Sequence, residues 1–327
     1  MNKRALIIGL LIGGCAAGGY WWMHSKSALD IHVTHQTATP PPELSKPKIA
    51  DAVVYQPSQN NHLSTDDKSF KAQFNHSKNY WQLAHELLAA AKAGEPDAQY
   101  YLWKAINFCT ENNQDYLEQD GQALTLKEAV QQANNLTPTQ GYVKSVFERC
   151  HEFHEKDASD LGSASDWLAR ATAAGQPAAQ GVTAQKFMLQ EVMQGFAKAG
   201  AAPIPITSGP QIDKETNPGE LMRAAAQSLD PDALYAIGWA QSYMNQGTNE
   251  EKQVNILAWT YIACQQGLDC SPNADWILRF CKTCDAPTPD LMMESLSGSK
   301  WYSVQQRAQD INAKLEAGQW GDLGFGQ

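Results

Sequence analysis

A short pattern that recurs three times along this chain constrains its fold more than any other feature. In each copy an alanine-rich helix end is followed by a glycine or another loop residue, and then by a proline and an alanine. The copies cover residues 90–98, 171–179 and 225–233. Glycine just past a helix and proline at the first helical position are favoured stop and start signals. Each copy therefore predicts a corner between two helices, and together they predict an all-α fold.

Residues on both sides of these corners extend the pattern. Segments 164–175 and 259–267 space Trp, Ala and Gly as in the second helix of a repeat, and segments 97–102 and 232–238 resemble the first. Together they resemble the Sel-one-like repeat, a relative of the tetratricopeptide repeat, and residues 231–267 carry both halves of one unit. This resemblance implies an α-solenoid of stacked helical hairpins, which binds protein partners and has no catalytic residues to carry over.

Hydrophobic periodicity and capping residues predict a series of helices and no long β-strand. The last of them is amphipathic and is expected to cap the stack. These helices place the repeat domain at residues 76–320, with a tail at 321–327. The predicted helices cover residues 78–93, 96–110, 125–134, 141–153, 163–174, 177–198, 218–228, 231–245, 250–266, 272–282 and 299–317.

The N-terminal residues 1–23 resemble a membrane signal. Lys3 and Arg4 precede an uncharged stretch that is long enough to cross a bilayer, and aromatic residues close it. We expect a signal anchor that places a single-pass protein in a bacterial inner membrane, with the C-terminal domain in the periplasm. A cleaved signal peptide would instead give a secreted or periplasmic protein. A lipoprotein lipidated at Cys15 is the third interpretation, because residues 12–15 resemble a lipobox.

Residues 24–75 are rich in Ser, Thr, Pro, Gln and Asn and have little apolar periodicity. Such a segment cannot bury enough apolar surface to offset the entropy lost on ordering. We therefore expect a flexible linker that displays the helical domain away from the membrane.

Cysteines beyond the N-terminal segment are even in number, which predicts disulfides after an export signal. Cys109 and Cys150 each end a predicted helix. We expect these two residues to pair and to staple the irregular segment 110–149 that separates them.

The other four cysteines are clustered near the C-terminus, where sequence allows three pairings. We expect Cys264 to pair with Cys281, and Cys270 with Cys284. A zinc site formed by all four cysteines is a more specific alternative to disulfides, since four thiolates suit tetrahedral zinc. Cys281 and Cys284 also have the Cys-x-x-Cys spacing of a thiol redox site, although no βαβ pattern surrounds them.

Motifs that would indicate an enzyme are missing from the sequence: a nucleophile elbow, a phosphate-binding glycine loop, a His-Glu-x-x-His motif and a dinucleotide fingerprint. We therefore expect no enzymatic activity, no cofactor and no dedicated metal site. An unrecognised hydrolase is kept as a third functional hypothesis, after the adaptor and the cysteine module described below. The net charge of −10 argues against a nucleic-acid partner. It also confines expected membrane contact to the N-terminal helix.

Aromatic residues that follow the alanine of a first repeat helix are candidates for binding. First helices line the inner wall of such solenoids, so Tyr101, Trp103, Trp239 and Tyr243 are the expected anchors for a partner. The sequence thus favours an envelope-anchored adaptor that binds another envelope protein or peptide. A metal-binding or redox module centred on the last four cysteines is the alternative.

Overall fold

A computed structural model describes residues 69–110, 116–119, 122–133, 140–198, 217–244, 247–271, 274, 276–277 and 288–326. The predicted anchor and nearly all of the predicted linker lie outside these residues. Among the residues that the structure describes, no helix has both the length and the apolar character needed to span a membrane.

The chain forms two compact units. One comprises Met1–Lys46 and Glu191–Pro205, and the other comprises Pro47–Gln190 and Ile206–Gln327. Of the first unit, the structure describes only residues 191–198, which form the last turns of helix α9 (Pro177–Lys198). The remaining described residues belong to the second unit.

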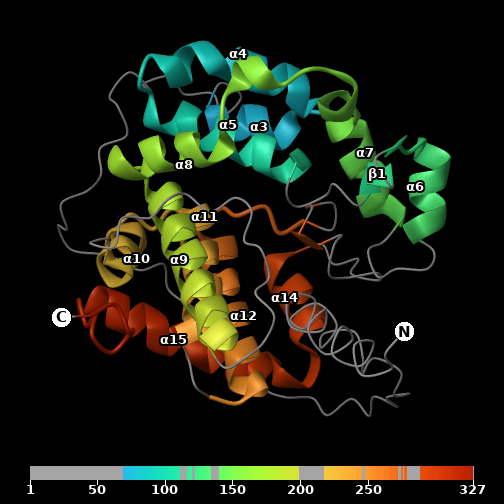
Figure 1. Cartoon of the computed structure of the whole chain (residues 1–327). Coiled ribbons are helices and arrows are strands. Elements are labelled where there is room, and N and C mark those ends of the chain that lie inside the picture. The colour runs from blue at the N-terminus through green and yellow to red at the C-terminus, as the bar shows by residue number, and fades with distance from the viewer. Residues whose placement is uncertain are drawn as a thin grey trace. The chain divides into compact units, whose positions relative to one another are not determined.

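The described residues are mostly helical, which confirms the all-α prediction (Figure 1). The strands are short: β1 (Glu118–Gln119) and β2 (Gln122–Ala123) pair antiparallel. The helices other than α9 are α3 (Phe70–His76), α4 (Tyr80–Lys92), α5 (Pro96–Thr110), α6 (Leu126–Ala133), α7 (Gln140–Glu155), α8 (Ala164–Ala173), α10 (Pro218–Gln227), α11 (Pro231–Met244), α12 (Asn249–Gln265), α14 (Pro289–Ser297) and α15 (Trp301–Glu316). Two 3-10 turns accompany them, η4 (Ser159–Leu161) and η5 (Gly298–Lys300).

All three predicted corners connect two helices, as the sequence pattern indicates. The residue two positions before each corner proline has a positive φ, which is 94° at Gly94, 80° at Gly175 and 54° at Leu229. In each corner this residue's N–H donates to the carbonyl three residues earlier, at 3.1, 3.0 and 3.2 Å respectively. The third corner thus takes the same conformation with a leucine where the other two have glycine.

Two helices were not predicted. Helix α3 lies at the end of the range 24–75 that is predicted as a flexible linker, so this end of the range is helical. Ser69 caps it, because the Ser69 hydroxyl accepts from Ala72 N at 3.1 Å, and Phe74 buries its ring. Helix α14 begins after Thr288, whose hydroxyl accepts from Leu291 N at 3.4 Å. Of the predicted helix at 272–282, only residues 276–277 are described as helical.

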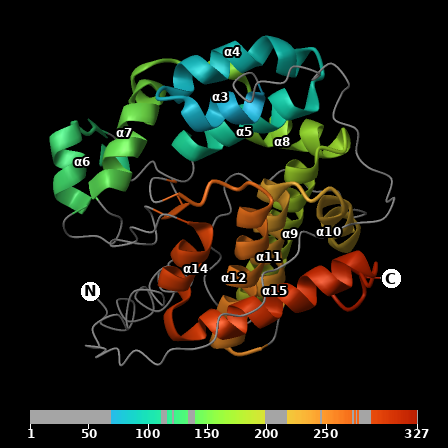
Figure 2. The same ribbon diagram turned by 180° about the vertical axis from the view of Figure 1, so that it is seen from behind.

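The helices of the second unit form two sets of neighbours. In the first helix group, which comprises α3 to α8, α5 packs against α4 and α8, and α7 packs against α4. In the second helix group, which comprises α10 to α15, α12 packs against α11, α14 and α15 (Figure 2). Helix α9 approaches α11 closely at Gly181, where an added Cβ would lie 3.0 Å from the Ala233 carbonyl oxygen.

The second helix group is packed around Trp259, which is fully buried. The Trp259 indole N–H donates to the Gln241 side-chain oxygen at 2.7 Å, and Gly238 allows the tryptophan to approach α11. The C-terminal residues belong to this core, because Leu323 and Phe325 are buried. The predicted tail is therefore a packed segment over its described length.

Candidate functional site

The disulfide predicted between Cys109 and Cys150 is confirmed, with a Cα–Cα distance of 5.2 Å. It joins the end of α5 to α7, and both cysteines are completely buried. The staple therefore reinforces the packing of the first helix group.

The pairings predicted for Cys264 and Cys270 are wrong, because these two residues are bonded to each other. The physical reason is local. Gly267 takes a φ of 99° just after α12 ends, and the resulting turn brings the two Cα atoms to 5.8 Å. The predicted partners, Cys281 and Cys284, lie outside the described residues.

The disulfide also bears on the zinc alternative, since Cys264 and Cys270 cannot act as thiolate ligands while they are oxidised. Within the described part of the chain, no three or more His, Cys, Asp or Glu side chains are arranged to hold a metal ion.

The predicted aromatic anchors differ in their exposure. Tyr101 is 4% exposed and Trp103 is 6% exposed, so the expectation that these two rings face a partner is wrong. Both are enclosed because α5 packs against several neighbouring helices. Trp239 and Tyr243 are half-buried on α11. Burial raises the pKa of the Tyr243 hydroxyl, although a hydrogen bond with Gln185 of α9 opposes that rise.

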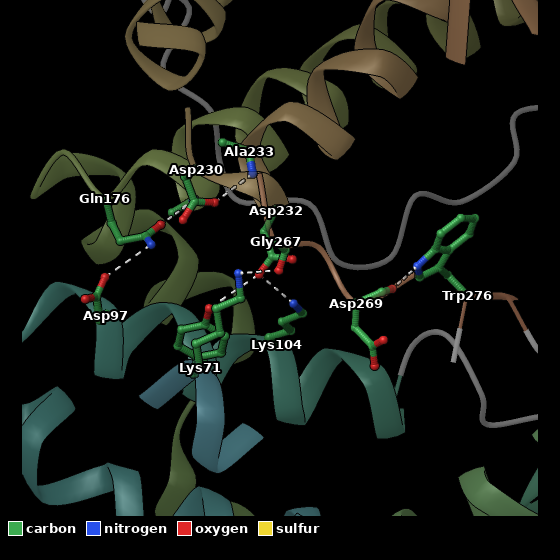
Figure 3. Close-up of polar contacts among 12 residues, drawn as sticks. Lys71, Asp97, Lys104, Gln176, Asp230, Asp232, Ala233, Gly267, Asp269 and Trp276 are labelled. Atoms are coloured by element: carbon green, nitrogen blue, oxygen red, sulfur yellow. Dashed lines mark hydrogen bonds and ion pairs between the residues drawn. The ribbon is translucent and has the colours of Figure 1, made fainter. Parts of the chain in front are cut away.

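A cluster of charged side chains that sequence reasoning missed lies where helices begin (Figure 3). It gathers residues from the start and the middle of α5, from the turn before α9, from the start of α11, and from α3 and the turn after α12. We call this cluster the corner junction. Its polar members are Lys71, Asp97, Lys104, Gln176, Asp230, Asp232 and the carbonyl of Gly267.

The strongest link in the corner junction joins α5 to α11. Lys104 Nζ lies 2.8 Å from Asp232 Oδ2, and the two side chains are 27% and 10% exposed. The Tyr101 hydroxyl donates to the same carboxylate oxygen at 3.4 Å. The Lys104 ammonium also lies 4.8 Å from the centre of the Phe74 ring, within the range of a cation–π contact.

The two carboxylates that open α11 have opposite electrostatic environments. Asp230 caps the helix, because its Oδ1 accepts from Ala233 N at 2.9 Å. Burial, together with the negative charge of Asp232, raises the pKa of Asp230 to about 6. Burial would also raise the pKa of Asp232, but the ammonium groups of Lys104 and Lys71 outweigh it and lower that pKa.

Two further contacts complete the corner junction. Lys71 of α3 donates to the Gly267 carbonyl at 3.3 Å, and Gln176 donates to Asp97 Oδ1 at 3.3 Å. Burial raises the pKa of Asp97, while the bond from Gln176 works in the opposite direction. Asp97 and Asp232 occupy the same position in their corners, one residue after the proline, and this repetition is the sequence signal that could have revealed the cluster.

The chemistry of the corner junction is that of a joint between helices. Burial and the charge of Asp232 raise the pKa of Tyr100 and of Tyr101 well above the ordinary value, so both phenols remain neutral donors. Lysine and carboxylate pair with each other there, and the cluster holds no serine or cysteine nucleophile. The arrangement thus connects the first helix group to the second through charged side chains.

Comparison with known proteins returns no match, whether to a protein family, to a curated protein or to a solved structure. The resemblance to Sel-one-like repeats therefore stays a prediction, and so does the function that it implies.

Proposed function

We propose that this chain is an envelope-anchored, non-enzymatic adaptor whose disulfide-stapled helical-repeat domain binds another envelope protein or peptide. The observation that carries this proposal is the corner that recurs with one backbone conformation, at Gly94, Gly175 and Leu229. Repeated corners allow helical hairpins to stack as a solenoid, an architecture that offers extended surfaces to partners. In this proposal residues 1–23 hold the domain in the periplasm of a bacterium, an oxidising compartment in which disulfides persist.

The proposed binding surface lies on α9 and α11, and we call it the binding strip. It consists of Gln185 and Leu189 of α9 together with Trp239 and Tyr243 of α11. Residues four apart share one face of a helix, and the hydrogen bond between Gln185 and Tyr243 brings the two faces together. Leu189 is 36% exposed, and half-buried aromatic side chains beside an exposed apolar one are typical of interface anchors.

Covalent cross-linking in intact cells of the producing organism, followed by affinity purification and mass spectrometry, tests the proposal. We expect a specific envelope partner that is recovered with the wild-type chain. Leu189→Glu should abolish its recovery, because a charge would be buried in the interface while the exposed side chain leaves the fold intact. The double variant with Trp239→Ala and Tyr243→Ala should have the same effect.

Tyr302→Ala is the matched control. Tyr302 is an aromatic residue that is 67% exposed, and it lies on α15, a helix that contributes nothing to the binding strip. This variant should recover the partner as wild type does. Circular dichroism of each variant separates loss of binding from loss of folding. The proposal would be contradicted if no partner is recovered above the background of the purification, or if Leu189→Glu recovers the partner as well as the wild-type chain does.

The thiol redox alternative narrows to Cys281 and Cys284. The other cysteines beyond Cys15 form two disulfides, and in this alternative Cys281 and Cys284, which lie outside the described residues, pair with each other. Each disulfide gains two hydrogens on reduction, so the mass of the intact chain with and without reductant counts the bonds. A gain for three disulfides means that Cys281 and Cys284 are oxidised, and a redox role then requires that this bond be the first to reduce.

A further inference from the structure

The corner junction links the two helix groups through a small number of charged contacts. Lys104 of α5 reaches Asp232 of α11 at 2.8 Å, and Lys71 of α3 reaches the Gly267 carbonyl after α12 at 3.3 Å (Figure 3). Both lysines come from the first helix group and both acceptors belong to the second. Because the attraction between the groups is electrostatic, its strength depends on which carboxylates are ionised.

The corner junction holds more negative than positive groups. Its carboxylates are Asp97, Asp230 and Asp232, and its two ammonium groups, those of Lys71 and Lys104, act on Asp230 and Asp232. The neighbouring phenols of Tyr100 and Tyr101 stay neutral. The Lys104 ammonium bonds to Asp232, whereas Asp230 bonds to the backbone N–H of Ala233. When every carboxylate is ionised, Asp230 and Asp232 repel each other at the end of one helix.

We propose that the corner junction is a proton-responsive hinge, in which Asp230 takes up a proton and the two helix groups are then held together more tightly. The neutral Asp230 carboxyl no longer repels Asp232 and no longer draws the lysines away from it. Lys104 then interacts with Asp232 alone, and Lys71 remains on the Gly267 carbonyl. The cap on α11 survives, since the carbonyl oxygen of a protonated Asp230 can still accept from Ala233.

The direction of the response follows from the pKa of each carboxyl. The pKa of Asp230 is raised from 3.8 to about 6, so the folded chain binds this proton more tightly than the unfolded chain does. The junction should therefore gain stability as the pH falls from about 7 towards 4. The pKa of Asp232 is lowered, so the pair with Lys104 persists through this window and weakens only at still lower pH.

Hydrogen exchange of the full chain at pH 7.5 and pH 5.5, corrected for the pH dependence of intrinsic exchange, tests the hinge. We expect the protection of α3 and of the turn at residues 266–270 to rise about fourfold at the lower pH. The thermal midpoint should rise by about 2 °C over the same interval. Asp230→Asn keeps the helix cap and imitates the neutral carboxyl, so its protection should be high at both pH values.

Glu95→Gln is the matched control, because Glu95 precedes its corner proline as Asp230 does. This variant should keep the wild-type response. Asp230→Ser, which is another favoured cap, replaces Asp230→Asn if that variant does not fold. An equal pH response in wild type and in Asp230→Asn would overturn the proposal, because the proton would then bind elsewhere. A rise in thermal midpoint without a change in α3 protection would overturn it too, since the joint would not have tightened.

Discussion

The two helix groups reinforce their packing in different ways. In the first helix group a disulfide joins residues 41 positions apart, Cys109 and Cys150. In the second, the disulfide between Cys264 and Cys270 spans only 6 positions. There the helices meet instead through a glycine, because an added Cβ at Gly238 would lie 2.8 Å from the Trp259 Cβ. The first group therefore relies on a covalent link between distant segments, and the second on close contact between backbones.

Removing the long-range disulfide should have the largest effect on stability. With both Cys109 and Cys150 changed to Ser, the free energy of unfolding should fall by about 4 kcal/mol, because the unfolded chain regains the entropy of an open loop. The same change at Cys264 and Cys270 should cost only about 2 kcal/mol, since the loop is short. Urea unfolding of both double variants measures the difference, and equal losses would contradict this account.

Substitution of the glycine at the contact between α11 and α12 tests the second group. Gly238→Ala should lower the free energy of unfolding by about 3 kcal/mol, because the added methyl meets a tryptophan that is fully buried and hydrogen-bonded. Gly195→Ala in α9 is the control: its Cβ would meet nothing within 4 Å, and helix propensity predicts a gain of about 0.5–1 kcal/mol. A loss at Gly238 no larger than the change at Gly195 would mean that α11 and α12 can separate without cost.

The features that could be predicted from the sequence are those that local signals determine. Helices α5 and α9 begin and end where the pattern placed them, because their corner prolines and adjoining loop residues are local signals. The Cys109–Cys150 bond was predictable because the two cysteines flank the irregular segment between two predicted helices, although Cys150 lies inside α7, which continues to Glu155. Among the four clustered cysteines, the turn at Gly267 determines that Cys264 bonds to Cys270. The spacing of cysteines in the sequence does not indicate whether such a turn or a longer loop brings two of them together.

Features that depend on contacts between distant segments were missed. Helix α3 is only 7 residues long, and its burial comes from Phe74, which stacks on Tyr80 at 4.7 Å. The corner junction brings together residues 71, 104, 232 and 267, and its charges become informative only when they are buried. Tyr101 and Trp103 were wrongly predicted as exposed anchors, and both are buried. The sequence pattern of a helix does not show how many other helices pack around it.

The link between the two groups should be weaker than either internal reinforcement. Lys104→Met leaves the Asp232 carboxylate without its ammonium partner, so the free energy of unfolding at pH 7 should fall by about 2 kcal/mol. Lys104 lowers the pKa of Asp232 in the folded chain. The stability that Lys104 adds is therefore complete above the pKa of this carboxyl in the unfolded chain, and it is lost as the pH falls below that value. The deficit of the variant should therefore shrink below about pH 4.

Denaturant unfolding at a series of pH values measures that deficit. Lys314→Met provides the control, because Lys314 Nζ lies 2.8 Å from Asp310 Oδ2 in a pair whose carboxylate side chain is 42% exposed. Exposed pairs four residues apart on a helix contribute only about 0.3–0.5 kcal/mol. If the loss at Lys104 is as small as the loss at Lys314, the corner junction does not hold the helix groups together.

The smallest effect is expected at the corners, where the two groups use different residues for one conformation. Gly94 in the first group has a φ of 94°, and an added Cβ there would meet nothing within 4 Å, so Gly94→Ala should cost only the backbone strain, about 1 kcal/mol. Gly175→Ala should cost about the same, because its Cβ is equally unobstructed. Leu229 in the second group already accepts a φ of 54°, which indicates that a corner tolerates such strain without losing its fold. Thermal unfolding of the two alanine variants measures this cost, and a loss above about 2 kcal/mol would mean that the glycine corners bear a constraint that the leucine corner does not.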